Sequence, residues 1–136
     1  MLRRLDDDMW VAGQIMPADI ADLAAQGVTV IINNRPDGEE RGQPAGADIA
    51  AAAQAAGLAC VAIPVAGGFS APQVEAMAAA LDRPGRTLAF CRSGTRSTLL
   101  WALARVRLGD NPQELDAKAA AAGYDLTPIR AYLQSH

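Results

Sequence analysis

Short apolar runs alternate along the chain with Ala-rich stretches of helical character. The runs from Val28 to Asn33 and from Arg86 to Phe90 are typical of buried strands. Ser70 followed three residues later by Gln73 is a capping-box signature, which predicts a helix through Leu81. Strands that alternate with helices build a parallel sheet with helices packed against it. The sequence therefore predicts an α/β fold with a mostly parallel central sheet and helices on both faces.

Residues that begin and end helices indicate the remaining elements. Pro near the start and Gly just past the end of an Ala-rich stretch is the usual asymmetry of a helix. We expect further strands over 10–14 and 58–65, helices over 17–26, 47–56 and 96–108, and two helical segments after Asn111 and Thr127. A chain of 136 residues fits one domain of ordinary size, so residues 1–136 are expected to form a single catalytic domain.

The charge pattern excludes several classes of partner. The formal net charge of -3 leaves no basic surface for nucleic acid. No stretch approaches the roughly 18 apolar residues that a membrane-spanning helix needs, and the N-terminal arginines run into three aspartates rather than a signal-peptide core. We expect a soluble, cytoplasmic protein that binds neither nucleic acid nor membranes.

Cysteine and histidine are both scarce. The two cysteines, Cys60 and Cys91, are expected to be free thiols in a cytoplasmic protein. The single histidine is His136, the last residue, which argues against a Cys-His pair and leaves no cluster for zinc. The sequence thus predicts no metal and no cofactor. Cys60 lies in an apolar run, where a buried inert thiol is the commoner state, and its use in resolving an oxidised Cys91 stays open.

The strongest functional signal is the loop Cys91-Arg92-Ser93-Gly94-Thr95-Arg96, between a predicted strand and a predicted helix. Ligands of parallel sheets bind beyond the carboxyl ends of the strands, where Cys91 lies. The backbone amides from Arg92 to Arg96 can form an anion-binding nest, with Gly94 permitting the required dihedral angles. The N-terminus of the following helix also favours negative charge. We therefore predict that Cys91 is a nucleophilic thiolate.

Side chains of the same loop extend the predicted anion site. The planar fork of Arg96 suits bidentate contact with a tetrahedral oxyanion. Arg92 raises the local positive potential, and the Ser97 hydroxyl is expected to donate a hydrogen bond to the sulfur. Cys91 and Arg96 are the predicted catalytic residues. The predicted anion-binding residues are Arg92, Ser93, Gly94, Thr95, Arg96 and Ser97.

This loop resembles those of two enzyme families. Rhodanese sulfurtransferases often have Cys-Arg-x-Gly-x-Arg, with four residues between Cys and Arg, whereas cysteine phosphatases related to protein tyrosine phosphatases have five. Four residues, Arg92 to Thr95, separate Cys91 from Arg96 here. The shorter loop implies that the anion-binding bowl, formed by residues 91–96, is smaller. A smaller bowl suits a terminal sulfur on Cys91 better than a phosphoryl group.

The wider sequence resembles the bacterial phosphatase-like domain of beta-lactamase hydrolase-like proteins, also described as a sulfur transferase family. Four blocks in order carry the resemblance: residues 13–17, 32–39, 63–65 and 90–97. The resemblance implies a dual-specificity-phosphatase-like fold. Relatives are joined to persulfide dioxygenase-type domains, which implies a partner of that type acting in trans.

A general acid separates phosphatase from sulfurtransferase chemistry. A phosphatase protonates its leaving alkoxide, often from an aspartate upstream of the cysteine. Residues 66–70 contain no carboxylate, so Asp37 is the substitute acid that the sequence offers, unless it only forms a turn. Arg35 is expected either to contact the anion or to hold Asp37 in place.

These observations favour a sulfurtransferase over two alternatives. In the favoured interpretation, Cys91 attacks a sulfane donor such as thiosulfate or a persulfide, carries the persulfide sulfur and passes it to a thiol acceptor. The first alternative is a cysteine phosphatase that cleaves a phosphoester through a phosphocysteine. The second is a non-catalytic module that binds an oxyanion or a phosphorylated ligand in the same bowl.

Overall fold

The computed structural model describes residues 2–134. Within these residues, five strands and six α-helices follow one another with two short 3-10 turns, Pro17–Asp19 and Thr127–Ile129. In chain order the elements are β1 (Leu2–Asp6), β2 (Met9–Ala12), α1 (Ile20–Ala25), β3 (Val28–Asn33), α2 (Gly46–Ala55), β4 (Ala59–Ala62), α3 (Ala71–Leu81), β5 (Arg86–Phe90), α4 (Thr95–Arg107), α5 (Pro112–Ala121) and α6 (Arg130–Gln134).

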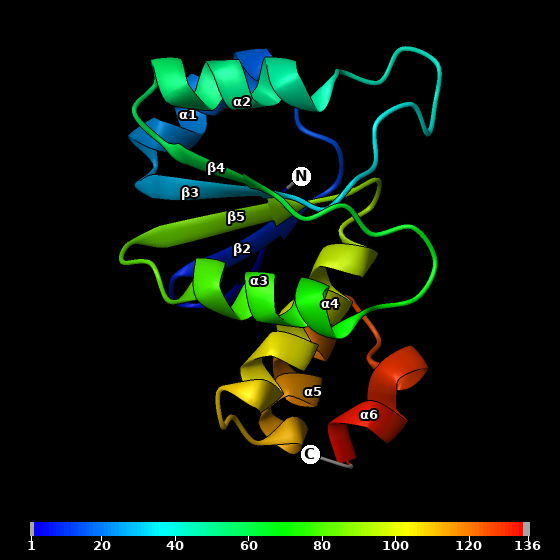
Figure 1. Ribbon diagram of the computed structural model, residues 1–136. Helices are drawn as coiled ribbons and strands as arrows, with labels where there is room; N and C mark the ends of the chain where they lie inside the picture. Colours follow the sequence, from blue (N-terminus) through cyan, green and yellow to red (C-terminus); the bar gives the residue numbers. More distant parts are fainter. Residues whose placement is uncertain (1, 135–136) are drawn as a thin grey trace.

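The sheet has the strand order β1-β2-β5-β3-β4 (Figure 1). Strands β2, β5, β3 and β4 are parallel, and only β1 runs antiparallel, against β2. The carboxyl ends of all four parallel strands therefore meet at one edge of the sheet. Because β5 is the middle strand, whatever follows Phe90 lies at the centre of that edge.

Helices cover both faces of the sheet, as predicted. Helices α1 and α2 pack on one face, and α3 to α6 gather on the other (Figure 1). Ile20 and Ile49 bury the first pair of helices against Ile31 of β3 and Leu88 of β5. The second face has the larger core, in which α4 supplies the fully buried Leu100. The predicted α/β class is confirmed, and the core holds β5 rigidly from both sides.

Two sequence predictions for strands need correction. No strand was predicted before residue 10, yet the charged N-terminal segment forms β1, because an edge strand leaves Arg3 and Arg4 in solvent while Leu5 is buried. The strand predicted over 58–65 is shorter, since ladder pairing ends at Ala62 before Pro64. The other predicted elements match to within a few residues, and both capping-box bonds of α3 are present.

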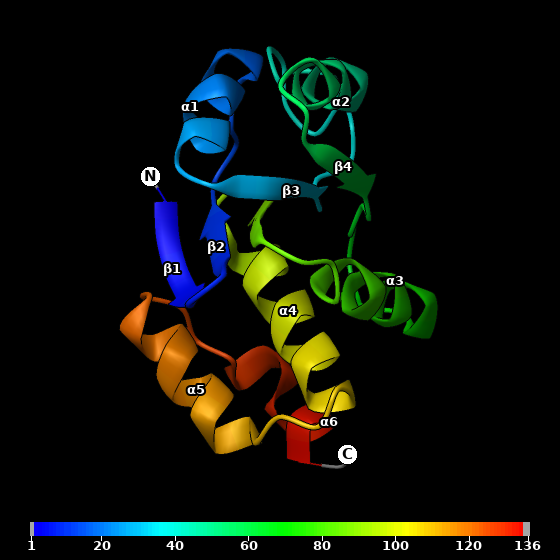
Figure 2. The same cartoon turned by 90° about the vertical axis from the view of Figure 1, so that its left-hand side faces the viewer.

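The C-terminal helices pack beside the antiparallel strand. Helix α5 lies against β1 (Figure 2). The Lys118 ammonium is 2.9 Å from the Asp6 carboxylate, and the Arg3 guanidinium donates to the Ala122 carbonyl at 3.1 Å. The segment after α4 is thus anchored to the sheet. Within residues 2–134, no helix combines the length and the apolar character needed to cross a bilayer.

Replacing Ile49 by Ala tests the packing of α2. Its side chain is fully buried between α2 and the sheet, so Ile49→Ala is expected to lower the free energy of unfolding by about 2–4 kcal/mol. Denaturant titration measures the change. Leu108→Ala is the control, because Leu108 is 46% exposed and its loss should cost less than about 0.5 kcal/mol. Equal effects of the two variants would contradict this packing.

Candidate active site

The loops that follow the parallel strands are tied together at the carboxyl edge of the sheet. The Cys91 N–H donates to the Ala12 carbonyl at 3.4 Å, which joins the ends of β5 and β2. On the other side, the Asn34 N–H donates to the Phe90 carbonyl at 2.9 Å. The Val65 N–H in turn donates to the Asn34 carbonyl at 3.0 Å. Cys91 therefore lies at the meeting point of four loops.

A tight turn encloses the Cys91 sulfur. Cys91 is only 1% exposed, and the Gly94 N–H donates to its Sγ at 3.1 Å. Gly94 has a φ of 90°, which glycine adopts at little cost, and it directly precedes α4. The first N–H groups of α4 have no acceptor within the helix and favour an anion at this point. At Gly13 a Cβ would lie 2.9 Å from the Arg92 carbonyl oxygen, so the neighbouring loop can approach only as glycine.

Arg96 is held on two sides and leaves one edge open. Its Nη1 donates to the Val65 carbonyl at 2.7 Å, and Nη1 and Nη2 both donate to the Glu39 carboxylate, at 2.7 and 2.8 Å. A guanidinium has five N–H donors, so Nε–H and one Nη2–H are not used by Glu39 and Val65. These two donors form a fork that fits two oxygens of a tetrahedral anion.

Glu39 is a fixed negative charge at the site. Its bidentate bond to Arg96, with a further 2.9 Å bond from Arg35, holds the pKa of Glu39 at about 2. The same contact with Glu39, followed by attraction to Cys91, raises the pKa of Arg96. Glu39 is thus ionised at neutral pH. Its role is to orient Arg96, and it does not offer a proton.

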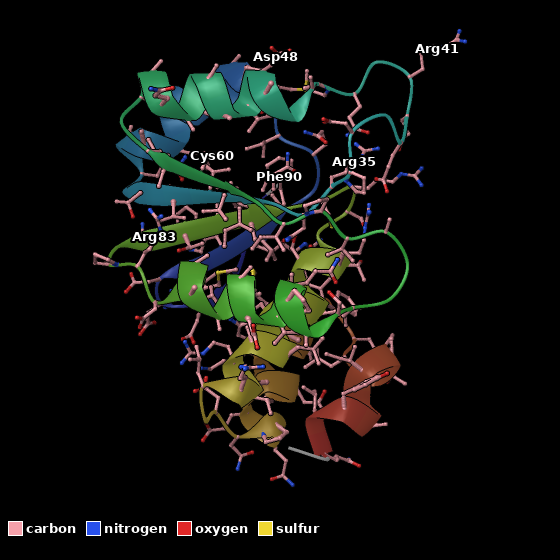
Figure 3. The ribbon with its side chains drawn as sticks, in the orientation of Figure 1. Arg35, Arg41, Asp48, Cys60, Arg83 and Phe90 are labelled. Carbon is pink, nitrogen blue, oxygen red and sulfur yellow. The ribbon has the colours of Figure 1, made fainter. Side chains whose placement is uncertain are left out.

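Arg35 organises the loop after β3. Its side chain is only 4% exposed and donates to Glu39, to Gln14 Oε1 at 3.0 Å and to Glu40 Oε1 at 2.9 Å. Glu40 also pairs with the exposed Arg92 at 2.6 Å. Figure 3 shows Arg35 at the carboxyl edge of the sheet. Among the described residues Arg35 makes no bond to Asp37, so the predicted tie between them is wrong. Its part in anion binding stays a prediction.

The hydroxyl groups of the loop point in different directions. Ser93 Oγ and Thr95 Oγ1 lie 3.2 Å apart on the exposed side. Ser97 is fully buried, and its Oγ has no hydrogen-bond partner among residues 2–134. The predicted bond from Ser97 to the Cys91 sulfur is therefore not formed. The part of Ser97 in anion binding stays a prediction.

Asp37 lies in the same loop but faces α2. Its Oδ1 accepts a hydrogen bond from the Gly46 N–H at 2.7 Å, at the first residue of α2. A carboxylate in this place satisfies an unpaired N–H of the helix start. This contact gives Asp37 a structural role. Its use as a general acid stays a prediction.

Cys60 and Cys91 are far apart within the same sheet. Cys60 on β4 is level with Ile31 on β3 and hence with Leu88 on β5. Cys91 lies three residues further and two strands across, which is roughly 10 Å in each direction. A disulfide needs Cα atoms within about 7 Å. Cys60 is therefore no resolving thiol in this fold, and burial raises its pKa.

Two residues that act on the site lie outside the predicted set. Glu39 carries no signal beyond its place in a polar loop, since its bond to Arg96 joins distant segments. Tyr124, from the segment after α5, donates from its hydroxyl to the Ser93 carbonyl at 3.0 Å. Over residues 2–134, no three His, Cys, Asp or Glu side chains are grouped to hold a metal ion. His136 lies outside the described residues.

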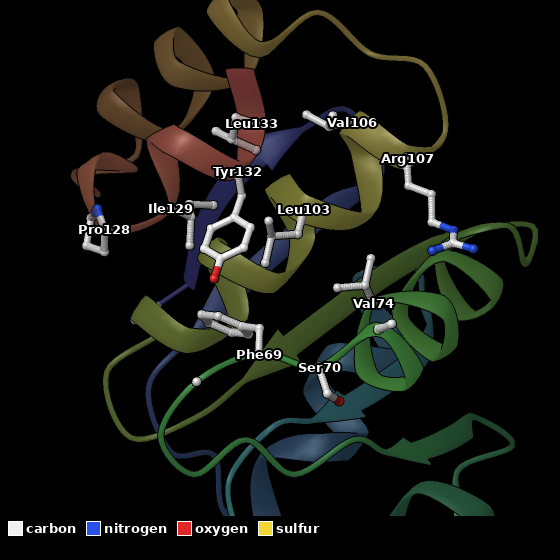
Figure 4. Close-up of a pocket in the computed structure, with 12 residues that line it drawn as sticks. Phe69, Ser70, Val74, Leu103, Val106, Arg107, Pro128, Ile129, Tyr132 and Leu133 are labelled. Atoms are coloured by element: carbon white, nitrogen blue, oxygen red, sulfur yellow. The ribbon is translucent and has the colours of Figure 1, made fainter. Parts of the chain in front are cut away.

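A second concavity lies away from the cysteine loop. It has a volume of about 440 Å³, and its mostly apolar walls include Phe69, Val74, Leu103, Ile129 and Tyr132 (Figure 4). These walls are formed by α3, α4, α6, the loop before α3 and the 3-10 turn Thr127–Ile129. The bowl at Cys91 is a separate site with charged surroundings.

The sequence comparisons agree with the geometry. The family model "Beta-lactamase hydrolase-like protein, phosphatase-like domain" matches residues 1–108. A beta-lactamase hydrolase-like protein of Agrobacterium fabrum is 34% identical over 134 residues, covering 96% of this chain and 31% of the relative. One of Xylella fastidiosa is 36% identical over 133 residues, covering 96% and 31%. The chain thus spans about a third of the length of the curated relatives it matches.

Solved structures place the same fold among phosphatases. A candidate phosphatase from Neisseria meningitidis has a TM-score of 0.82 and 33% identity, covering 98% of this chain and 96% of that one. A candidate DUF442 phosphatase from Shewanella putrefaciens has a TM-score of 0.77 and 23% identity, covering 98% and 88%. Human DUSP28 has a TM-score of 0.67 and 23% identity, covering 98% and 90%. The last two show a likeness of fold alone, and the predicted dual-specificity-phosphatase-like fold is confirmed.

The predicted sulfurtransferase function is wrong. The matched family model is that of a phosphatase-like domain, and the fold is that of solved phosphatase structures. The prediction relied on two observations. The loop between Cys91 and Arg96 is one residue shorter than in tyrosine-phosphatase relatives, and residues 66–70 contain no carboxylate. Loop length proved a poor guide to the reaction. A leaving group of low basicity needs little protonation, so the missing carboxylate does not exclude a phosphatase.

Glu39→Gln tests the ion pair with Arg96. The pKa of Glu39 falls from 4.5 to about 2 on folding, so the ion pair stabilises the fold above about pH 4.5 and is lost as the pH falls toward 2. We expect the variant to be less stable by about 1 kcal/mol at pH 7, with the difference shrinking below pH 4.5. Urea titrations at several pH values measure it.

Glu75→Gln is the matched control for Glu39→Gln. Glu75 pairs with Arg107 at 2.9 Å, but both side chains are at least half exposed. Its replacement should change stability by less than about 0.5 kcal/mol at pH 7. A stability loss in Glu39→Gln that stays constant down to pH 2 would contradict the ion-pair interpretation.

Proposed function

Because the chain belongs to the family of phosphatase-like domains of beta-lactamase hydrolase-like proteins, we propose that it is a cysteine-dependent phosphatase for small phosphoesters. The observation that carries this proposal is the pairing of Cys91 with the open fork of Arg96. The sulfur is held by the Gly94 N–H, and Arg96 is fixed by Glu39 and Val65. Nucleophile and anion clamp are thus preorganised before a substrate binds.

The proposed reaction has two displacements at phosphorus. In the first, the Cys91 thiolate attacks phosphorus, an S–P bond forms and the P–O bond to the leaving group breaks. Loop N–H groups and the open fork of Arg96 contact the equatorial oxygens, whose charge they stabilise in the transition state. In the second, water attacks phosphorus, the S–P bond breaks, and inorganic phosphate and the thiolate are released.

The carboxylates around the bowl restrict the leaving group. Glu39 is ionised and clamped to two arginines, and Glu40 is paired with Arg35 and Arg92. Because its pKa is held at about 2, Glu39 is not suited to donate a proton at neutral pH. Asp37 is the remaining candidate acid of this loop, and it is bound to the Gly46 N–H. We therefore propose substrates whose leaving oxygen is already stabilised, such as aryl phosphates, in preference to alkyl phosphates.

Cys91→Ser and Arg96→Lys test the proposed roles. Cys91→Ser should lower kcat for an aryl phosphate on the order of a thousandfold or more, since it removes the nucleophile. Arg96→Lys keeps the charge but lacks the fork, and we expect a loss of about a hundredfold or more. Phosphate release from p-nitrophenyl phosphate measures both. Arg83→Lys, at the opposite edge of the sheet, is the control and should keep the activity (Figure 3).

Wild-type protein and Cys91→Ser together distinguish the proposed phosphatase from an oxyanion-binding module. Phosphate release that survives in Cys91→Ser would contradict a cysteine mechanism. Tight binding of inorganic phosphate without any turnover would favour an oxyanion-binding module instead.

A persulfide dioxygenase-type partner in trans and a cytoplasmic location stay predictions.

Asp37→Asn separates the acid role from the structural role. If Asp37 protonates the leaving group, the variant loses far more activity on phenyl phosphate than on p-nitrophenyl phosphate, because only the more basic phenolate needs the proton. We expect instead that the losses on the two substrates are small and equal, since Asp37 contacts the start of α2. The ratio of kcat/KM for the two substrates is the measurement. A ratio that changes tenfold would establish Asp37 as the acid.

A further inference from the structure

Tyr124 reaches the cysteine loop from a part of the chain beyond the matched region. The family model covers residues 1–108, whereas Tyr124 follows α5. Its hydroxyl donates to the Ser93 carbonyl at 3.0 Å. The contact is close, because a Cβ added at Gly94 would overlap the Tyr124 hydroxyl oxygen. The ring therefore rests directly on the backbone that encloses Cys91.

The bond falls on one particular peptide group. The Ser93 carbonyl and the Gly94 N–H belong to the same planar unit, and in a trans peptide they point in opposite directions. Tyr124 binds the oxygen of this unit, while its N–H donates to Cys91 Sγ at 3.1 Å. Fixing the oxygen fixes the direction of the N–H. It also polarises the peptide, which strengthens the N–H as a donor to a negative sulfur.

Neighbouring hydrogen bonds fix the position of Tyr124, and partial burial keeps its phenol protonated. The Tyr124 N–H donates to the Ala119 carbonyl at 2.9 Å, and Arg3 of β1 donates to the Ala122 carbonyl. The end of α5 is thereby anchored to the sheet. Partial burial raises the pKa of Tyr124, so its phenol keeps its proton at neutral pH.

We propose that Tyr124 is a positioning residue for the nucleophile, acting through the Ser93–Gly94 peptide group to stabilise the Cys91 thiolate. The proposal rests on the proposed function in one respect, that Cys91 is the reactive group. By this inference the segment after α4 belongs to the catalytic unit. A chain that ended after α4 would keep the cysteine loop but lose this support.

Alkylation of Cys91 by iodoacetamide tests the proposal without any phosphatase substrate. The measurement uses the full chain with Cys60→Ala, so that one thiol reports. In Tyr124→Phe the Gly94 N–H is a weaker donor, so the midpoint of the pH profile of alkylation should move to higher pH. At neutral pH the rate should fall about two- to fourfold. At high pH, where both proteins carry the full thiolate, the rates should converge.

Tyr132→Phe is the matched control. Tyr132 lies at the apolar pocket between α4 and α6, 62% exposed, and losing its hydroxyl should leave the alkylation profile unchanged (Figure 4). A Tyr124→Phe profile that coincides with that of the control would overturn the proposal. A rate reduced by the same factor at every pH would also overturn it, because that pattern reports access to the sulfur and not its charge.

Replacement of Tyr124 by 3-fluorotyrosine keeps the test decisive if Tyr124→Phe does not fold. The fluorinated phenol is a stronger donor of nearly the same shape, so below the pH at which it ionises the alkylation midpoint should move to lower pH. An unchanged midpoint would overturn the proposal. Absence of phosphate release by the wild-type protein would instead contradict the proposed function and leave this result standing.

Discussion

A buried sulfur that is to react as an anion must have its compensating donors in place before the substrate arrives. Cys91 is 1% exposed, so water cannot supply them. Cys91 follows the central strand of the sheet, and this position brings the start of α4 and the Gly94 N–H beside the sulfur. The fold around the site can be understood as the scaffold that holds this one turn.

The same constraint explains why so many charges surround a small bowl. Three arginines and two glutamates form one connected network, in which Glu39 and Glu40 hold the guanidinium groups of Arg35, Arg92 and Arg96. The carboxylates limit the excess of positive charge and fix the direction of each fork. The edge of Arg96 that Glu39 and Val65 do not use is available to interact with Cys91 and with an anion bound beside it.

Local patterns made much of the fold predictable from the sequence. The central strands β3 and β5, the capping box at Ser70 and the cysteine loop are all encoded by neighbouring residues, and each was predicted in its place. The edge strand β1 was missed because its exposed arginines hide the alternation. Glu39 and Tyr124 were missed for a different reason. Their contacts join segments distant in the sequence, which no local pattern reveals. The sulfurtransferase prediction was wrong because it relied on loop spacing, whereas the family model that matches residues 1–108 is that of a phosphatase-like domain.

The most direct test of the central claim is to trap the covalent intermediate. The protein is mixed with an aryl phosphate, quenched in acid within milliseconds and analysed by intact mass and peptide mapping. A cysteine phosphatase should show the added mass of one phosphoryl group, located on Cys91 and absent after longer incubation without substrate. Phosphate release in the same samples with no phosphoryl group on Cys91 would contradict the mechanism.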